Sequence, residues 1–431
     1  MASRLRRAVP DLELVRKSAV VLSGFSVARL LGFLFAVAAA RLLAPADFGR
    51  MTYALALAAI AGVLISAAPC GLSRYLARHR DDLALQEDYF GNWMTVVALL
   101  LVASTAVALP AAAALGLDGL MVVGIAANLV GVTILESYKE ILRGLDRFTS
   151  MALCYGLANL LQLLAILGAA GLGWRSPALF VVIYGLSGLV ACVVMQAVAP
   201  VHLRFGWPVL TRSRMLEVLR FIRPLLLQSV FFAVWLSSDL ILVQHMMNAT
   251  ATGNYGAAKT LSNAVWLAPA AIGTVLVPRV ARLPDAELKR YLPRVAALAA
   301  LVTVPAAVAL WVFEQPLTAF TFGTRYPDAA APLGLLGLGM ALHGLYMVPF
   351  GLWIGLGRPT IDMVAAAVGM VCTVGAALVL IPSGGLMGAA TAFCLGSALR
   401  LAVISGFTVW AIYLRPESAS RVALSREVAL P

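Results

Sequence analysis

Twelve long apolar runs dominate this sequence of 431 residues, and each is long enough to cross a lipid bilayer as a helix. A membrane-spanning helix needs roughly 20 apolar residues to cover about 30 Å of hydrocarbon. Apolar residues make up 62% of the chain and charged residues 12%, whereas soluble proteins have roughly 45–50% and 25%. We therefore expect an all-α, polytopic membrane protein with 12 transmembrane helices, and this composition excludes a soluble enzyme or a nucleic-acid-binding domain. The runs are 18–40, 51–70, 93–115, 119–139, 150–172, 177–199, 224–247, 261–278, 295–313, 333–356, 360–382 and 385–411.

Basic residues alternate between rich and poor loops along the chain. With the N-terminus in the cytoplasm, 25 of the 32 Lys and Arg residues lie in cytoplasmic segments, and Arg29 and Arg400 lie within spans. Cytoplasmic loops of membrane proteins carry the excess of Lys and Arg, so this distribution supports both the span count and the orientation. We expect a multi-pass protein of the cell inner membrane with both termini in the cytoplasm. The remaining five basic residues are predicted to lie outside: Arg41, Arg50, Arg175, Lys259 and Arg325.

The longest cytoplasmic connection, at about residues 200–223, divides the spans into two groups of six. It is basic and carries Trp207 and Pro208, a composition that is typical of an amphipathic segment at a lipid surface. We therefore expect an N-terminal six-helix lobe at 1–205, a basic cytoplasmic linker at 206–223 and a C-terminal six-helix lobe at 224–431. None of the loops is long enough to form a separate catalytic domain.

The two predicted lobes contain matching short segments. Residues 44–57, between spans 1 and 2, align with residues 248–261, between spans 7 and 8, at an offset of 204 positions. A second match pairs 142–147, after span 4, with 354–358, after span 10. Two repeats of the same orientation are a common plan of membrane transporters, so the matches favour two pseudo-repeated lobes. The first alignment pairs Gly49 with Gly253, Ala54 with Ala258 and Leu57 with Leu261.

Motifs for metal or nucleotide chemistry do not occur in the sequence. The four histidines show no His-Glu-x-x-His spacing, and neither a phosphate-binding Gly-x-x-x-x-Gly-Lys loop nor a Gly-x-Ser-x-Gly elbow is present. The five cysteines all fall in apolar runs and form no Cys-x-x-Cys pair, so we interpret them as small buried apolar side chains. We therefore expect no cofactor, no metal site and no enzymatic activity.

Two ionisable residues deep within predicted spans are candidates for substrate binding. Arg29 lies about 11 residues into span 1, and Asp239 is similarly deep in span 7, its repeat partner. Ionisable residues within the membrane are costly and are functional candidates for that reason. In one interpretation Arg29 binds an anionic group of the substrate, and Asp239 modulates this binding or carries a coupling proton. In the other, the two form an ion pair that only joins the lobes.

Further candidates follow from their positions in the predicted spans. Arg74 and Arg279 end spans 2 and 8 at equivalent places, where they could bind a phosphate or simply follow the positive-inside rule. Arg400 lies in span 12 and is interpreted as structural, with substrate contact as the alternative. Gln162 is predicted to line a cavity or bridge helices, and Trp235 to stack on a sugar ring or to belong to the core. A charged stretch from Glu136 to Arg143 at the end of span 4 predicts a helix-end ladder of ion pairs.

Four segments resemble those of a known family. The stretch from Arg29-Leu-Leu-Gly32 to Leu43-Ala-Pro-Ala-Asp-Phe-Gly49 looks like the first hairpin of the polysaccharide, or O-antigen type, flippases. These belong to the multidrug/oligosaccharidyl-lipid/polysaccharide (MOP) exporter superfamily, which includes the MATE transporters. The loop 142–147 resembles the one after their fourth helix, and Phe322-Gly323 with Tyr326 resembles the segment that leads into their tenth. The segment 381–390 resembles the Pro-x-x-Gly-x-x-Gly-Ala-Ala turn between their last helices.

This resemblance implies a MATE-like pair of lobes around a central cavity and transport by alternating access. The implied substrate is a polyprenyl-diphosphate-linked oligosaccharide, and the implied partners are membrane lipid, a polysaccharide polymerase and glycosyltransferases. Arg29 occupies a first-helix position where the related lipid-linked peptidoglycan precursor flippases also carry Arg. Two alternatives remain: a cation-coupled multidrug exporter of the same superfamily, and a membrane-embedded glycan polymerase or ligase.

Overall fold

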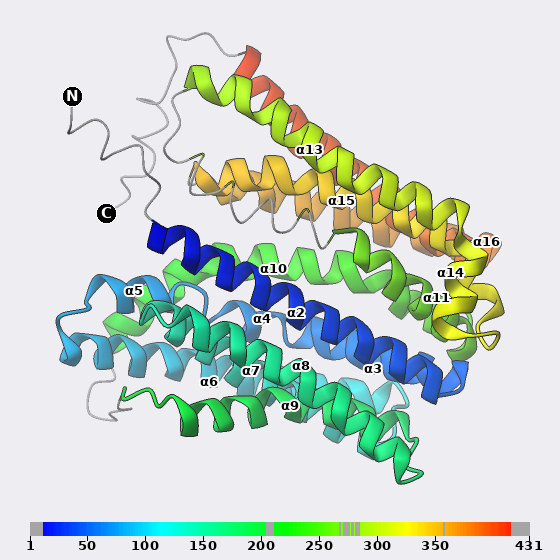
Figure 1. The fold of residues 1–431 in the computed structure, drawn as a ribbon, viewed down its shortest axis with the longest axis horizontal. Coiled ribbons are helices and arrows are strands. Elements are labelled where there is room, and N and C mark those ends of the chain that lie inside the picture. Colours follow the sequence, from blue (N-terminus) through cyan, green and yellow to red (C-terminus); the bar gives the residue numbers. More distant parts are fainter. Residues whose placement is uncertain are drawn as a thin grey trace.

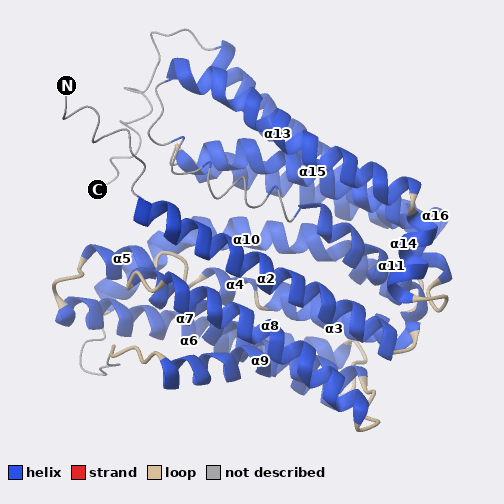
Figure 2. Cartoon of the chain, in the orientation of Figure 1, coloured by secondary structure: helices blue, strands red, loops and turns tan. Residues whose placement is uncertain are grey.

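The structure, a computed structural model, describes residues 12–203, 211–266, 269, 276, 280, 285–356 and 358–414. Helices and short connections account for these residues, and none of them forms a strand (Figure 2). The all-α expectation is therefore confirmed. The helices of the first half are α2 (Leu12–Leu42), α3 (Pro45–Ala61), α4 (Val63–Ala67), α5 (Leu72–Arg78), α6 (Leu83–Ala114), α7 (Gly119–Gly144), α8 (Phe148–Gly171) and α9 (Pro177–Val198).

The second half, like the first, begins with a long helix that is followed by a shorter one. Figure 1 shows the halves as two layers that are separated at the end where α2 begins and meet at the end where α3 and α11 begin. We call the end where α3 and α11 begin the closed end, and the end where α2 begins the terminal end. The elements of the second half are α10 (Arg212–Met246), α11 (Ala249–Ser262), η2 (Asn263–Trp266), α13 (Asp285–Val312), α14 (Glu314–Phe322), η3 (Pro327–Ala329), α15 (Ala330–Gly355), α16 (Pro359–Val409) and η4 (Trp410–Leu414).

The helices agree with the predicted spans. Among the described residues nine helices are long and apolar enough to cross a membrane, or ten if the bent pair 45–61 and 63–78 forms one span. One of the nine, α16, contains two predicted spans, because Gly385 (φ 56°, ψ −132°) interrupts its helical backbone between 360–382 and 385–411. Glycine adopts a positive φ without the steric cost that a Cβ imposes. The predicted span 261–278 begins in α11 and η2 and continues outside the described residues.

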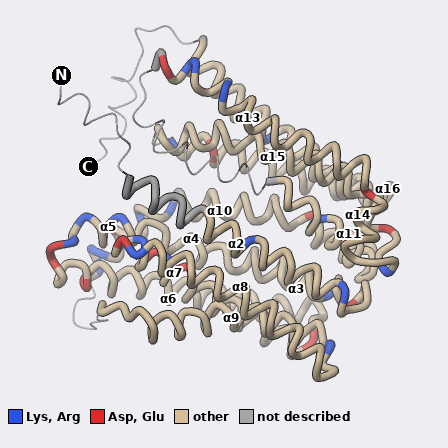
Figure 3. The backbone as a smooth tube through the Cα atoms, viewed as in Figure 1, with Lys and Arg blue, Asp and Glu red and all other residues tan. Residues whose placement is uncertain are grey.

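Charged residues are concentrated toward the two ends of the molecule (Figure 3). The middle of the long helices is mostly uncharged, as a bilayer interior requires. Many apolar side chains on the outer surface of the molecule are exposed, such as Val107 (72%), Val379 (72%) and Leu301 (71%). In water such a surface would be costly, so it fits a chain whose outer surface faces lipid.

The closest contact between the halves is the crossing of α3 and α11 at the closed end. A Cβ on Gly49 would lie 1.9 Å from the carbonyl oxygen of Ala249, and a Cβ on Gly253 would lie 1.9 Å from that of Pro45. These two contacts are related by the 204-position offset of the sequence repeat, since Pro45 corresponds to Ala249. The repeat is therefore present in space as a pseudo-twofold pair of helices, and only glycine permits such a close approach.

Local sequence determines where these two helices begin. Pro45 occupies the first position of α3, where its fixed φ suits a helix and its missing N–H removes no hydrogen bond. Asn248 caps α11, because its side-chain oxygen accepts a 2.9 Å hydrogen bond from the Ala251 N–H. Lys259, predicted in an outer loop, instead lies within α11 and is buried. That prediction was wrong because α11 is rich in Ala, Gly and Thr and lacks the apolar run that marks a span.

The glycine crossing gives the first testable prediction. Gly253→Ala should separate α3 from α11, because the added Cβ collides with the backbone of Pro45, which cannot move aside as a side chain can. Overpacking of this kind costs about 1–3 kcal/mol or more, so we expect a lower melting temperature of the purified protein. Gly168→Ala is the matched control, since no atom lies within 4 Å of the added Cβ. Equal melting temperatures for both variants would contradict the close approach.

Candidate functional site

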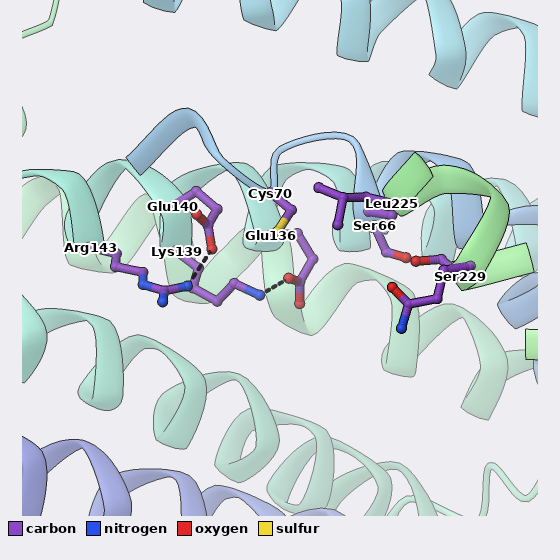
Figure 4. A pocket seen from close by; sticks show the side chains of 10 residues that line it. Ser66, Cys70, Glu136, Lys139, Glu140, Arg143, Leu225 and Ser229 are labelled. Atoms are coloured by element: carbon purple, nitrogen blue, oxygen red, sulfur yellow. Dashed lines mark hydrogen bonds and ion pairs between the residues drawn. The ribbon is translucent and has the colours of Figure 1, made fainter. Parts of the chain in front are cut away.

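A polar pocket lies between the two halves. It has a volume of about 410 Å³, within the roughly 300–1,000 Å³ of small-molecule sites. α4 and the turn before α5 form one wall, the last turns of α7 form the second and α10 forms the third (Figure 4). We call it the interlobe pocket, and its lining residues are Ser66, Ala67, Cys70, Glu136, Lys139, Glu140, Arg143, Leu225, Gln228 and Ser229.

The wall formed by α7 carries alternating charges. The spacings of three and four residues place Glu136, Lys139, Glu140 and Arg143 along one side of the helix. Lys139 forms an ion pair with Glu136, and the Arg143 Nη1 lies 3.5 Å from a Glu140 oxygen (Figure 4). These i,i+3 pairs confirm the predicted ladder. The ladder also forms a pocket wall, which the sequence did not indicate, because the opposite walls come from segments distant in the chain.

The two carboxylates of this wall have further partners. Tyr155 on α8 donates a hydrogen bond to Glu136, and Ser73 on α5 donates one of 2.7 Å to Glu140. Each carboxylate thus has a cation and a hydroxyl group as partners. The wall therefore contains two negative and two positive charges and is neutral as a unit.

The wall formed by α10 is polar but uncharged. Leu225, Gln228 and Ser229 follow the i, i+3, i+4 spacing, so they lie on one face of the helix. Gln228 also contacts the protein interior on its other side, where its Nε2 donates a hydrogen bond to an oxygen of Asp362 on α16. Cys70, predicted to be a buried apolar side chain, is exposed. It lies in the turn between α4 and α5. The sequence did not indicate this turn, because residues 51–70 form one continuous apolar run.

Asp362 belongs to a buried polar group in the second half, which we call the Arg400 cluster: Gln228, Trp235, His343, Tyr346, Asp362 and Arg400. Arg400 and Asp362 are 2% and 0% exposed, and the Arg400 Nη2 lies 3.7 Å from the Asp362 Oδ1. The guanidinium carbon of Arg400 lies 3.8 Å from the Tyr346 ring centroid and 4.9 Å from that of Trp235. Buried charges of this kind persist only when they are paired, and aromatic faces add to the stabilisation of Arg400.

A second buried ion pair joins α10 to α11. The Lys259 Nζ lies 2.5 Å and 2.6 Å from the two oxygens of Asp239, and Tyr255 donates a 2.7 Å hydrogen bond to the same carboxylate. The interpretation that Asp239 pairs with Arg29 was therefore wrong, because Lys259 supplies the cation. The error follows from the assignment of Lys259 to a loop.

Hydrogen bonds across the halves seal the closed end. Arg41, at the end of α2, donates to the carbonyl oxygens of Thr321 (2.7 Å) and Phe320 (2.5 Å) on α14. Tyr326 donates a 2.7 Å hydrogen bond to the carbonyl oxygen of Ala40. Burial raises the pKa of Tyr326 above its usual value, so its hydroxyl remains a donor at physiological pH. Together with the glycine crossing, these contacts make the closed end a continuous seam.

The structure places the other predicted site residues outside the pocket lining. Arg29 is exposed on α2, Arg74 is exposed on α5 and lies 6.0 Å from the Phe221 ring centroid, and Gln162 bridges α8 to the Tyr184 carbonyl oxygen of α9 at 3.3 Å. Trp235 and Arg400 are brought together, but Trp235 is fully buried, and its ring packs against those of His343 and Phe393. Arg279 lies outside the described residues. The substrate roles of these residues stay predictions.

Solved structures with a similar fold are membrane transporters. An inward-facing conformation of a multidrug resistance MATE family transporter of the MOP superfamily matches with a TM-score of 0.71 and 18% identity, over 96% of this chain and 100% of that chain. An outward-facing conformation of such a transporter gives a TM-score of 0.65 at 18% identity, over 96% of both chains. The lipid II flippase MurJ in an inward closed conformation matches with a TM-score of 0.72 and 12% identity, over 90% of this chain and 86% of that chain.

Sequence comparison gives the family. No curated protein matches the chain significantly. The model of a family described as polysaccharide biosynthesis protein matches residues 14–284, which is more than half of the chain. This protein therefore belongs to the polysaccharide biosynthesis protein family.

Proposed function

We propose that this protein moves a polyprenyl-diphosphate-linked oligosaccharide across the cell inner membrane by alternating access, for the synthesis of a surface or extracellular polysaccharide. The interlobe pocket holds the polar head group while the lipid tail stays in the bilayer. The terminal end faces the cytoplasm, where glycosyltransferases assemble the substrate, and the closed end faces outward, where a polymerase consumes it. The observation that carries this proposal is a polar pocket between two pseudo-repeated lobes that are sealed at one end.

The physical requirement for such a pocket follows from the substrate. A hydrated glycan and a diphosphate lose their hydrogen bonds to water when they enter hydrocarbon, and unpaired polar groups there are costly. Carboxylates, cations, hydroxyls and an amide line the pocket and can replace those hydrogen bonds. Because both lobes contribute walls, a movement of one lobe against the other changes the side from which the pocket is reached.

The arrangement of the lobes supports an inward-facing state. The seam closes the end opposite to the start of α2, whereas the side chain of Arg143, which lines the pocket, is 56% exposed. The higher TM-score to the inward-facing than to the outward-facing MATE structure agrees with this assignment.

A cation-coupled multidrug exporter is the second candidate, and the buried carboxylates Asp239 and Asp362 favour it. Both are fully buried within the spans, where a cation-coupled exporter is expected to carry carboxylates. Each already pairs with a Lys or Arg side chain, which leaves the oligosaccharide flippase as the better-supported function. Efflux of ethidium from cells, with no loss of surface polysaccharide on deletion, would favour the exporter instead.

Cys70 offers a direct test of the pocket. In a variant with the other four cysteines replaced by Ala, we expect a membrane-impermeant maleimide to label Cys70 from the cytoplasmic side. A polyprenyl diphosphate carrying a disaccharide should slow this labelling severalfold, because the head group covers the thiol. A single-cysteine variant that carries Arg80→Cys in place of Cys70 is the control and should show no protection, because Arg80 is exposed and lies outside the pocket lining. Labelling of Cys70 at the same rate with and without the lipid would refute the assignment.

Arg29 provides the second test, independent of the pocket lining. We expect Arg29→Ala to abolish export of lipid-linked glycan, since it removes the cation from the middle of α2. Arg29→Lys should retain part of the activity, because a charge remains without the planar guanidinium. Export is measured as surface polysaccharide, with protein level determined by immunoblot. Wild-type export by Arg29→Ala would exclude a substrate role for this residue.

The seam gives the third test. Arg41→Ala combined with Tyr326→Phe removes three hydrogen bonds between the lobes, each contributing about 1 kcal/mol. The inward-facing state should therefore lose population, and cytoplasmic labelling of Cys70 should slow. Arg50→Ala is the matched control: Arg50 lies at the same end, and its ion pair is with Asp47 of its own helix. An unchanged labelling rate in the double variant would show that the seam does not set the conformation.

A further inference from the structure

Gln228 connects the interlobe pocket to the Arg400 cluster through a single side chain. Its amide lines the pocket, and its Nε2 donates a hydrogen bond to the Oδ2 of Asp362. Asp362 is fully buried, so it contacts the pocket only through Gln228. The side-chain amide of glutamine carries a donor at one position and an acceptor at the other. What it presents to the pocket therefore depends on which of these groups faces Asp362.

Asp362 determines this orientation because an ionised carboxylate accepts hydrogen bonds and cannot donate them. The reverse orientation would place the Gln228 Oε1 against a carboxylate oxygen of Asp362. Two hydrogen-bond acceptors would then be in contact, and the buried carboxylate would lose its amide donor. Arg400, 3.7 Å away, supplies the positive charge that a buried carboxylate needs. The guanidinium group of Arg400 also packs against the rings of Tyr346 and Trp235. The amide is thus held with its N–H toward Asp362 and its oxygen free to face the pocket.

We propose that Asp362 is a positioning residue which makes Gln228 present a hydrogen-bond acceptor to the interlobe pocket, so that the pocket selects hydroxyl or amide donors of a sugar over phosphate. This inference rests on the proposed function, since it names which part of the lipid-linked substrate occupies the pocket. The glycan part of the head group contacts the α10 wall through its hydrogen-bond donors.

The α7 wall favours the same occupant. A diphosphate needs N–H donors, but Lys139 and Arg143 already face Glu136 and Glu140, and the two carboxylates would repel an anion. Sugar hydroxyls can donate to these carboxylates and accept from the two cations without a change in net charge. Gln228, with its amide nitrogen turned toward Asp362, presents its oxygen to the pocket, and an oxygen acceptor cannot hydrogen-bond a phosphate oxygen. Both walls are therefore matched to a polyhydroxylated, uncharged ligand.

The test uses protection of Cys70 by two soluble probes, a free disaccharide of N-acetylglucosamine and inorganic diphosphate. In the protein with Cys70 as its single cysteine, the disaccharide should slow maleimide labelling and diphosphate should not. Asp362→Asn should weaken protection by the disaccharide about tenfold, the effect of roughly one hydrogen bond, because an Asn accepts the amide in either orientation. Asp88→Asn is the matched control, since it removes the carboxylate of an Asp–Arg pair outside the pocket, with Arg214.

A double variant separates positioning from structural damage. Gln228→Glu combined with Asp362→Asn exchanges the acid and the amide, so that the new amide donates to the new carboxylate, whose second oxygen faces the pocket. Protection by the disaccharide should return to near the wild-type level. If Asp362→Asn alone does not fold, Gln228→Leu is used in its place, and it should weaken protection by the disaccharide to the same extent. The double variant is then compared with Gln228→Leu. Failure of the double variant to protect better than Gln228→Leu would overturn the positioning role.

The remaining outcomes distinguish this inference from the proposed function. Protection by diphosphate and not by the disaccharide overturns the inference but keeps the pocket as a head-group site. Protection by neither soluble probe, with the lipid-linked disaccharide also ineffective, overturns both. Protection by the disaccharide that is equal in wild type and Asp362→Asn overturns the role of Asp362 and leaves a sugar site.

Discussion

The close crossing of α3 and α11 is the constraint on which the arrangement of the lobes depends. Gly49 lies against the carbonyl oxygen of Ala249, and Gly253 lies against that of Pro45. The 204-position repeat relates these two contacts to each other. Contacts of small residues are a main source of helix association in lipid, where apolar side chains gain little by leaving the bilayer. Because this crossing lies at one end, the lobes can separate at the other, and the interlobe pocket lies on that side of the crossing.

Asp239 and Asp362, two fully buried carboxylates among the described residues of the second half, each pair with a cation and accept a hydrogen bond from a polar side chain. Asp239 pairs with Lys259, and Asp362 pairs with Arg400 and Gln228. Removal of one partner would leave an uncompensated charge in a low-dielectric region, which costs several kcal/mol. These pairs therefore fix how α10 lies against α11 and α16. Since α10 also forms a wall of the pocket, the interior of the second lobe determines the geometry of the site.

The sequence predicted the span positions, the repeat and the glycine pair, because apolar run length and short-range spacing determine these features. The assignment of Lys259 to a loop failed because α11 is short and only weakly apolar, and its burial comes from contacts with the other half. Asp239 was consequently given the wrong partner. The ion pairs of α7 were predicted from i,i+3 spacing, but their role as a pocket wall was not, since the opposite walls are about 70 and 90 residues away. Asp362 follows Pro359 and resembles an ordinary helix start, so nothing in the sequence indicated that it orients Gln228.

The neutral charge of the α7 wall affects how easily the empty protein can return to the inward-facing state after it has released its substrate. In the cycle that we propose, the lobes close once around the head group and once around an empty pocket. A pocket with unpaired cations would bind a diphosphate strongly, but the empty form would then have to bury those charges during the return. Pairs such as Glu136–Lys139 and Glu140–Arg143 remove this cost, because each charge keeps its partner when the ligand leaves. A ligand shifts the equilibrium between two states only by its difference in affinity for them, so a neutral wall that hydrogen-bonds sugar hydroxyls can bind in one state and release in the other.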